Sequence, residues 1–130
     1  MSAGKPVLVD TSAWVETLRK VGDAETRAEV RRLTLQGLVR LCDPVRLELW
    51  NSTGSEADRR LLERLQEDVE SVETTPEVWG HAQRLAWASR RAGLTLPAID
   101  LLVAACARVH GLGLLHRDAH FDRLAEISPR

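Results

Sequence analysis

Residues 7–14 read Val-Leu-Val-Asp-Thr-Ser-Ala-Trp, an apolar, β-branched run that ends at an acidic residue. A short run of this kind is typical of a strand that is buried on both faces of a parallel sheet. Ser12 is a good helix-capping residue, so the pattern predicts a helix from Ser12 to about Arg19. The stretch is therefore a strand followed at once by a helix, which is the unit of α/β folds.

Outside this stretch, short apolar runs continue to alternate with segments of helical pattern. Further strands are predicted at residues 38–42, around Val72 and at 114–115, and Ile127 fits a terminal edge strand. Helices are predicted over about 23–36, 43–50, 55–69, 75–91, 98–109 and 120–124. Strands separated by helices imply a parallel sheet with crossover connections. Because no linker or low-complexity segment interrupts the pattern, we expect one domain over residues 1–130.

Two of the predicted helices carry apolar stripes that suggest which side chains enter the core. Leu61, Leu62 and Leu65 are expected to form the inner face of the helix at 55–69. Trp79 lies on the apolar stripe of the helix at 75–91, which favours a packing role for its indole over stacking on nucleic-acid bases.

Composition limits the class of protein. With 130 residues, 44% hydrophobic and 28% charged, the chain has the composition of one globular domain and not of a disordered segment. No uncharged apolar run approaches the roughly 20 residues of a membrane-spanning helix, and no signal-peptide core is present. Cys42 and Cys106 lack the spacing of a zinc site and are interpreted as buried thiols of a reducing compartment. We therefore expect a cytoplasmic protein that does not enter a membrane.

Four acidic residues stand where packing alone does not favour them. Asp10 and Asp118 follow predicted strands at their carboxyl ends, where ligands bind in open α/β sheets. Asp100 is the one acid near the start of an otherwise apolar helix, and a buried, unpaired carboxylate is strongly unfavourable. Glu48 also lies within an apolar pattern. We call these four residues the acidic cluster.

Each member of the acidic cluster has a simpler explanation when it is taken alone. Asp10 and Asp118 could cap the helices that follow them, and Glu48 could lie exposed beside Arg46. For Asp100 the helix dipole supplies only about 0.3–1 kcal/mol, too little to offset burial. Taken together, however, the four acids would meet at one edge of the sheet, where two charges about 4 Å apart repel by about 4 kcal/mol. Such a cluster needs protons or divalent cations.

The chemistry of the candidate ligand atoms limits which cation the acidic cluster could bind and which reaction it could support. Hard oxygen ligands without Cys or His partners select Mg²⁺ or Mn²⁺. A pair of such ions held by carboxylates suits the in-line attack of water on a phosphodiester. The net charge of −1 does not argue against a nucleic-acid substrate, because two bound Mg²⁺ ions would bring it to about +3.

Four segments in order resemble a known family. They are 7–14, 44–49 (Pro-Val-Arg-Leu-Glu-Leu), 96–105 (Leu-Pro-Ala-Ile-Asp-Leu-Leu-Val-Ala-Ala) and 114–125 (Leu-Leu-His-Arg-Asp-Ala-His-Phe-Asp-Arg-Leu-Ala). Over essentially its whole length the chain resembles PIN-domain ribonucleases of the VapC toxin type, from type II toxin–antitoxin systems. The resemblance implies a PIN-domain-like, three-layer α/β/α fold with a short, mostly parallel central sheet flanked by helices.

The resemblance also implies an activity and partners. The expected protein is an Mg²⁺-dependent endoribonuclease, with Mn²⁺ able to substitute, that hydrolyses RNA and thereby inhibits translation. It would form a homodimer and bind a cognate VapB-type antitoxin whose C-terminal segment masks the acidic site. The expected products are a 5′-phosphate and a 3′-hydroxyl.

Motif by motif, the resemblance makes the acidic cluster the catalytic metal ligands: Asp10, Glu48, Asp100 and Asp118. Thr11 or Ser12 would be the polar neighbour of the metal. The chain departs from the family pattern at His120, where many members have a second acid in the form Asp-x-Asp-Phe. A second metal site is therefore expected to be weak or to use fewer protein ligands, and His120 is either a plain substitution or a ligand of the metal or of a phosphate.

Two other functions remain open on the sequence. The first is an Mg²⁺-dependent phosphatase or phosphotransferase that uses Asp10 as a nucleophile, although Ser12 stands where such an enzyme needs its second acid. The second is a non-catalytic PIN-like binding module whose acids pair with arginines of a partner.

Overall fold

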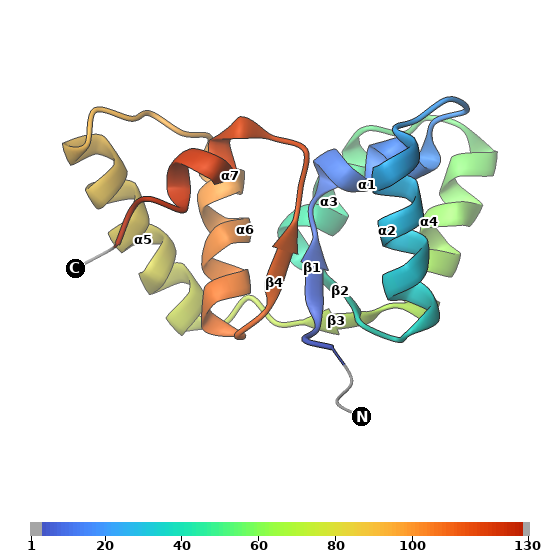
Figure 1. Cartoon of the computed structure of the whole chain (residues 1–130), viewed down its shortest axis with the longest axis horizontal. Helices are drawn as coiled ribbons and strands as arrows, with labels where there is room; N and C mark the ends of the chain where they lie inside the picture. Colours follow the sequence, from blue (N-terminus) through green and yellow to red (C-terminus); the bar gives the residue numbers. More distant parts are fainter. Residues whose placement is uncertain (1–3, 129–130) are drawn as a thin grey trace.

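The computed structural model describes residues 4–128, which form a four-stranded sheet between two layers of helices (Figure 1). The strands are β1 (Val7–Val9), β2 (Val39–Cys42), β3 (Glu70–Val72) and β4 (Gly113–Leu115), in the order β3-β2-β1-β4. All neighbouring strands run parallel. The predicted three-layer α/β/α fold is confirmed, and the described sheet is parallel throughout.

Seven helices connect and cover these strands within residues 4–128. They are α1 (Thr11–Leu18), α2 (Ala24–Leu35), α3 (Asp43–Asn51), α4 (Glu56–Asp68), α5 (Pro76–Arg91), α6 (Ala98–Val109) and α7 (Ala119–Leu124). In Figure 1, α5, α6 and α7 lie on one side of the sheet and α2 and α4 on the other. Three of the helices begin at caps that the sequence indicates, since Asp23, Ser55 and Thr75 each accept a backbone N–H of the first turn.

The first helix begins earlier than the sequence predicts. Asp10, and not Ser12, is the N-cap of α1, and its carboxylate accepts the Ser12 backbone N–H. Asp10 still has the extended backbone of the strand, so Thr11 is the first residue with helical geometry. The abrupt change from β1 to α1 therefore occurs at the acidic residue itself.

The core lies where α6 crosses the sheet. All residues of α6 from Asp100 to Ala107 are buried, and Val103 packs in one hydrophobic cluster with Leu8 and Val9 of β1. Cys42 and Cys106 are buried free thiols, as the sequence predicts. Because β1 is paired on both sides, its carboxyl end is held rigidly in the middle of the sheet.

The predicted inner face of α4 is confirmed at Leu62 and Leu65 and wrong at Leu61, and Trp79 of α5 is wrongly predicted to pack inward. Leu61 is 46% exposed while Leu62 is buried, and Trp79 is 55% exposed while Val78 is buried. Successive residues of a helix lie about 100° apart around its axis, so Leu61 and Trp79 lie at the edge of their apolar stripes and outside the buried face. The structure thus leaves two large apolar side chains on the surface.

The predicted terminal edge strand is also wrong. Ile127 lies in no strand, and its backbone N–H donates to the Leu124 carbonyl at 2.9 Å, which continues the turn after α7. No helix of residues 4–128 combines the length and the apolar character that a bilayer crossing requires.

Candidate metal centre

The acidic cluster lies at the carboxyl edge of the sheet, at the top of Figure 1. Asp10 follows β1 directly, and Asp118 follows the neighbouring strand β4 after a short turn. Asp100 lies in the first turn of α6, and Glu48 lies in α3. Four separate segments thus bring their carboxylates to the edge where parallel sheets bind ligands.

Asp10 is buried, and only one of its two carboxylate oxygens accepts hydrogen bonds within the described residues. Its side chain Oδ2 accepts the Ser12 backbone N–H at 3.0 Å and the Ser12 hydroxyl at 2.6 Å. The other oxygen, Oδ1, has no hydrogen-bond partner within the described residues, although the residue is only 3% exposed. A buried carboxylate oxygen without a partner is unfavourable, and a bound cation would satisfy it.

Ser12 fixes the position of Asp10. Its hydroxyl donates to Asp10 and accepts the backbone N–H of Arg117 at 2.9 Å. The Asp10 backbone N–H in turn donates to the Leu115 carbonyl at 2.9 Å. Ser12 therefore ties the end of β1 to the segment after β4, which is the role of a positioning residue.

Glu48 is held by Thr11. The Thr11 hydroxyl donates to Glu48 Oε1 at 2.8 Å. Burial raises the pKa of the Glu48 carboxyl above its ordinary value, the Thr11 hydrogen bond opposes this, and the charges of the other three acids raise the pKa further. The mutual influence of these charges means that the four carboxylates lie close enough to repel one another.

Asp100 and Asp118 share a histidine. The Nδ1 atom of His120 lies 2.7 Å from Asp100 Oδ2 and 3.2 Å from Asp118 Oδ1. Burial raises the pKa of the Asp100 carboxyl, the His120 hydrogen bond lowers it, and the charges of Asp118 and Asp10 raise it again. One ligand atom from each of Asp100, Asp118 and His120 fits within 4.8 Å of the others, which is compatible with a shared metal ion.

The simpler explanations of the acids hold only in part. Asp10 and Asp118 do cap α1 and α7, since each accepts a backbone N–H of the helix it precedes. These bonds use one oxygen of each carboxylate. Arg46 does not pair with Glu48 but with Asp43, at 2.6 Å. Asp10 and Asp118 can therefore each cap a helix and still offer a carboxylate oxygen to a ligand. Glu48 has no arginine partner among the residues that the structure describes.

The contact of His120 with both acids is a feature that sequence reasoning missed. The sequence marks His120 as a departure from the expected acid, but its position between two carboxylates depends on how α7 packs against α6. One feature of the sequence did indicate the contact with Asp118. His120 lies two residues after Asp118, in the short helix α7 that Asp118 caps.

The raised pKa of Glu48 leads to a testable pH dependence. Because folding raises this pKa, the folded protein binds the proton more tightly than the unfolded chain, and stability is lost as pH rises through the window above pH 4. We expect the Glu48→Gln variant, freed of metal by chelation, to gain stability relative to wild type between about pH 4 and pH 7. Denaturant unfolding across this range measures the difference. Glu67→Gln, at an exposed site of α4, is the control, and a difference that is constant with pH would contradict the expectation.

Comparison with protein families and curated proteins identifies relatives over nearly the whole chain. A model of the PIN domain matches residues 7–127. The chain is 37% identical over 126 residues to Ribonuclease VapC11 of Mycobacterium tuberculosis, which covers 94% of this chain and 93% of that protein. It is 32% identical to Ribonuclease VapC21 of the same species, over 78% of this chain and 76% of the relative.

Solved structures share the fold at lower sequence identity. The FitAcB structure from Neisseria gonorrhoeae matches with a TM-score of 0.74 and 22% identity, covering 94% of each chain. The DNA-bound VapBC structure from Salmonella typhimurium matches with a TM-score of 0.76 and 17% identity, covering 93% of each chain. These matches extend over the sheet and the helices that position the acidic cluster.

Proposed function

This chain belongs to the PIN domain family, with VapC ribonucleases as its curated relatives, and from this premise we propose that it is the endoribonuclease toxin of a toxin–antitoxin pair. The observation that carries the proposal is the acidic cluster, in which a buried carboxylate oxygen of Asp10 has no partner within residues 4–128. The proposed reaction is hydrolysis of RNA phosphodiester bonds, with inhibition of translation as its consequence.

The residues of the cluster fit a divalent cation, which we propose to be Mg²⁺, with Mn²⁺ able to substitute. Asp10 and Asp100 are buried and would hold the ion, together with Glu48. When bound, such an ion lowers the pKa of a coordinated water and neutralises charge on the phosphate. Thr11 orients Glu48 by donating its hydroxyl to one oxygen, which leaves the other oxygen for the site.

Asp118 has a different exposure and a different proposed role. Its side chain is 33% exposed, against 11% for Asp100, so it can reach a substrate phosphate at the mouth of the site. We assign to Asp118 the orientation of the attacking water, or a share in holding a second ion. Attack of the water oxygen on phosphorus and cleavage of the bond to the 3′ oxygen leave a 5′-phosphate and a 3′-hydroxyl.

Two rival functions fit the geometry less well. A phosphatase that uses Asp10 as a nucleophile needs an accessible carboxylate, but Asp10 is buried and Ser12 donates to its Oδ2. A binding module whose acids meet arginines of a partner needs exposed acids, and burial of Asp10 and Asp100 opposes this.

Induction of the protein in cells tests the proposed function. Mapping of RNA 5′ ends after induction should reveal new internal ends, and the rate of protein synthesis should fall. The Asp100→Asn variant is the control and should produce neither effect. Equal patterns of 5′ ends for wild type and variant would refute the proposal.

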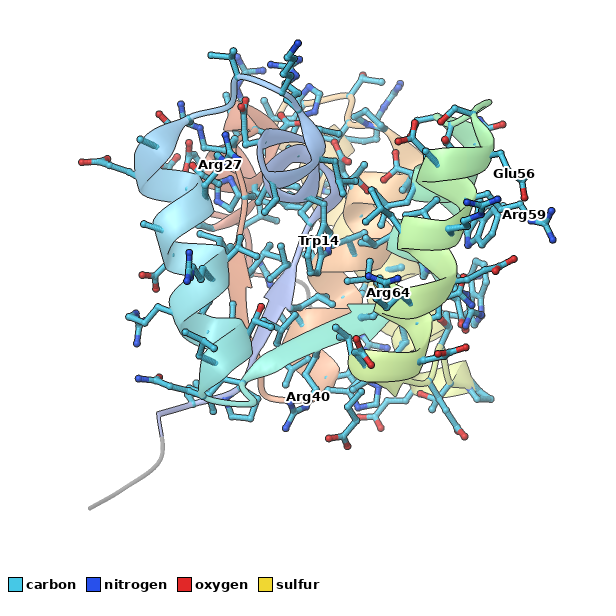
Figure 2. The ribbon with its side chains drawn as sticks, turned by 90° about the vertical axis from the view of Figure 1, so that its right-hand side faces the viewer. Trp14, Arg27, Arg40, Glu56, Arg59 and Arg64 are labelled. Atoms are coloured by element: carbon cyan, nitrogen blue, oxygen red, sulfur yellow. The ribbon has the colours of Figure 1, made fainter. Side chains whose placement is uncertain are left out.

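The proposed partner is a VapB-type antitoxin, and an apolar groove supports its binding. The groove, of about 310 Å³, lies between α2 and α4, with Trp14 at its base and the exposed Leu35 and Leu61 at its sides. Figure 2 shows Trp14 between the two helices, with Arg64 on α4 beside it. Because several of the matched solved structures are VapBC complexes, we propose that an apolar segment of the antitoxin occupies this groove.

A homodimer is also proposed, and a different surface supports it. Trp79 and Trp87 are both exposed on α5, at a spacing of eight residues that places them on one face of the helix. In Figure 1, α5 lies on the far side of the molecule from α2 and α4. Exposed tryptophans are enriched in protein interfaces.

Paired variants separate the two surfaces. We expect the double variant Trp79→Ser, Trp87→Ser to be a monomer that still binds the antitoxin, whereas the wild type is a dimer. We expect Leu35→Ser with Leu61→Ser to weaken antitoxin binding by about tenfold or more and to leave the dimer intact. Light scattering measures the mass and titration calorimetry the affinity. Each pair serves as the control for the other, and identical behaviour of both pairs would contradict the assignment.

A further inference from the structure

His120 lies within the candidate metal centre, between two of its carboxylates. Asp118 accepts the His120 backbone N–H at 2.9 Å, so the start of α7 fixes the histidine relative to this carboxylate. The imidazole Nδ1 then lies 2.7 Å from Asp100 and 3.2 Å from Asp118. A ring nitrogen is thereby directed between two carboxylates from different helices.

The acidic cluster has one basic neighbour within the described chain. Arg117 is adjacent to Asp118 in sequence, but its guanidinium lies 3.4 Å from Asp23. Within residues 4–128, His120 is the one basic side chain within ion-pair distance of the cluster. The Nδ1 atom of His120 thus lies beside two carboxylates, at a place that suits a cation.

A second observation places a ligand at the same edge of the sheet. Asp10 is more than nine-tenths buried, its Oδ1 has no hydrogen-bond partner in the described structure, and its charge acts on Asp100. An ion held by Asp100, Asp118 and His120, whose ligand atoms lie within 4.8 Å of one another, would lie at this same edge. The imidazole would then carry its proton on Nε2, and the 36% exposure of this side chain is compatible with contact to solvent.

The geometry points to His120 as a direct ligand, through Nδ1, that shifts the preference of this site from Mg²⁺ toward Mn²⁺. This inference rests on the proposed function, because it concerns the ion of the same site. Mg²⁺ strongly prefers oxygen ligands, whereas imidazole nitrogen suits first-row transition metals. A neutral imidazole, unlike a carboxylate, also contributes no negative charge to the binding of a hard cation such as Mg²⁺.

Magnetic resonance of the Mn²⁺-loaded protein tests this directly. Electron spin echo spectroscopy detects the coupling of Mn²⁺ to a ligating nitrogen, and competition titrations give the Mn²⁺ and Mg²⁺ affinities. For wild type we expect a directly bonded ¹⁴N coupling and tighter binding of Mn²⁺. In His120→Asp the coupling should disappear, and the ratio of Mn²⁺ to Mg²⁺ affinity should fall by about tenfold or more.

The control and the other outcomes keep this inference separate from the proposed function. His110→Gln removes a histidine at the opposite end of α6 from Asp100, where it contacts the Glu73 carbonyl, and should retain both the coupling and the affinity ratio. If Mn²⁺ binds without a nitrogen coupling and His120→Asp leaves the ratio unchanged, the inference is wrong while the metal-dependent function stands. If neither ion binds to wild type, the metal centre itself and the function proposed for it are overturned.

Discussion

Replacement of Asp100 by asparagine is expected to reduce RNA cleavage by about 10²–10³-fold, or more, and to leave the fold intact. Asparagine has the shape of aspartate and can still accept the hydrogen bond from His120, but it cannot balance the charge of a divalent ion. Because burial raises the pKa of Asp100, the ionised carboxylate is unfavourable in the metal-free fold. The variant should therefore unfold at the same or a higher temperature than wild type in the absence of metal.

Rates of cleavage of a defined RNA by the purified proteins measure the first effect, and thermal unfolding with and without Mn²⁺ measures the second. Mn²⁺ should raise the melting temperature of wild type more than that of Asp100→Asn. Asp122→Asn, at an exposed acid of α7, is the control and should cleave as wild type does. If Asp100→Asn cleaves RNA at the wild-type rate, Asp100 has no role in the reaction.

Two variants of Asp10 separate its two roles. An asparagine in this position would still accept the Ser12 N–H, since asparagine is as good an N-cap as aspartate, whereas alanine cannot. We expect Asp10→Asn and Asp10→Ala to lose cleavage to a similar extent, about 10²–10³-fold. Only Asp10→Ala should also lose about 0.5–2 kcal/mol in free energy of unfolding, as measured by denaturant titration under chelation.

The comparison of these two variants decides between capping and catalysis. If Asp10→Asn cleaves RNA at the wild-type rate while Asp10→Ala does not, Asp10 acts only through the helix that it caps. If Asp10→Asn is inactive and as stable as wild type, the buried oxygen without a partner has the functional role that its position suggests.

The four strands and most helix starts could be predicted from the sequence because both depend on local residue types, although Ile127 forms no strand and α1 begins one residue before Ser12. The run at residues 7–9 and the caps at Asp23, Ser55 and Thr75 lie where the sequence indicates them. The width of the buried face of a helix depends instead on the neighbours that the helix packs against. For this reason Leu61 and Trp79 are exposed, although the apolar stripes of their helices predict that both face inward.

The position of the acidic cluster could be predicted for a topological reason. Parallel strands end at one edge, so Asp10, directly after β1, and Asp118, three residues after β4, are expected to lie close together. The contacts of His120 with Asp100 depend on packing between α6 and α7 and on side-chain rotamers, which no pattern of spacing contains. The sequence marks the residue as unusual, but its contacts follow only from the fold.

The central claim is that the acidic cluster hydrolyses RNA by direct attack of water on phosphorus. Single-turnover cleavage of a defined RNA by the purified protein in H₂¹⁸O, followed by mass spectrometry of the fragments, tests this claim most directly. We predict one ¹⁸O atom in the 5′-phosphate of the downstream fragment, a 3′-hydroxyl on the upstream fragment, and no cleavage by Asp100→Asn. A 2′,3′-cyclic phosphate, or a first-turnover label in the Asp10 carboxylate instead of the phosphate, would contradict the account.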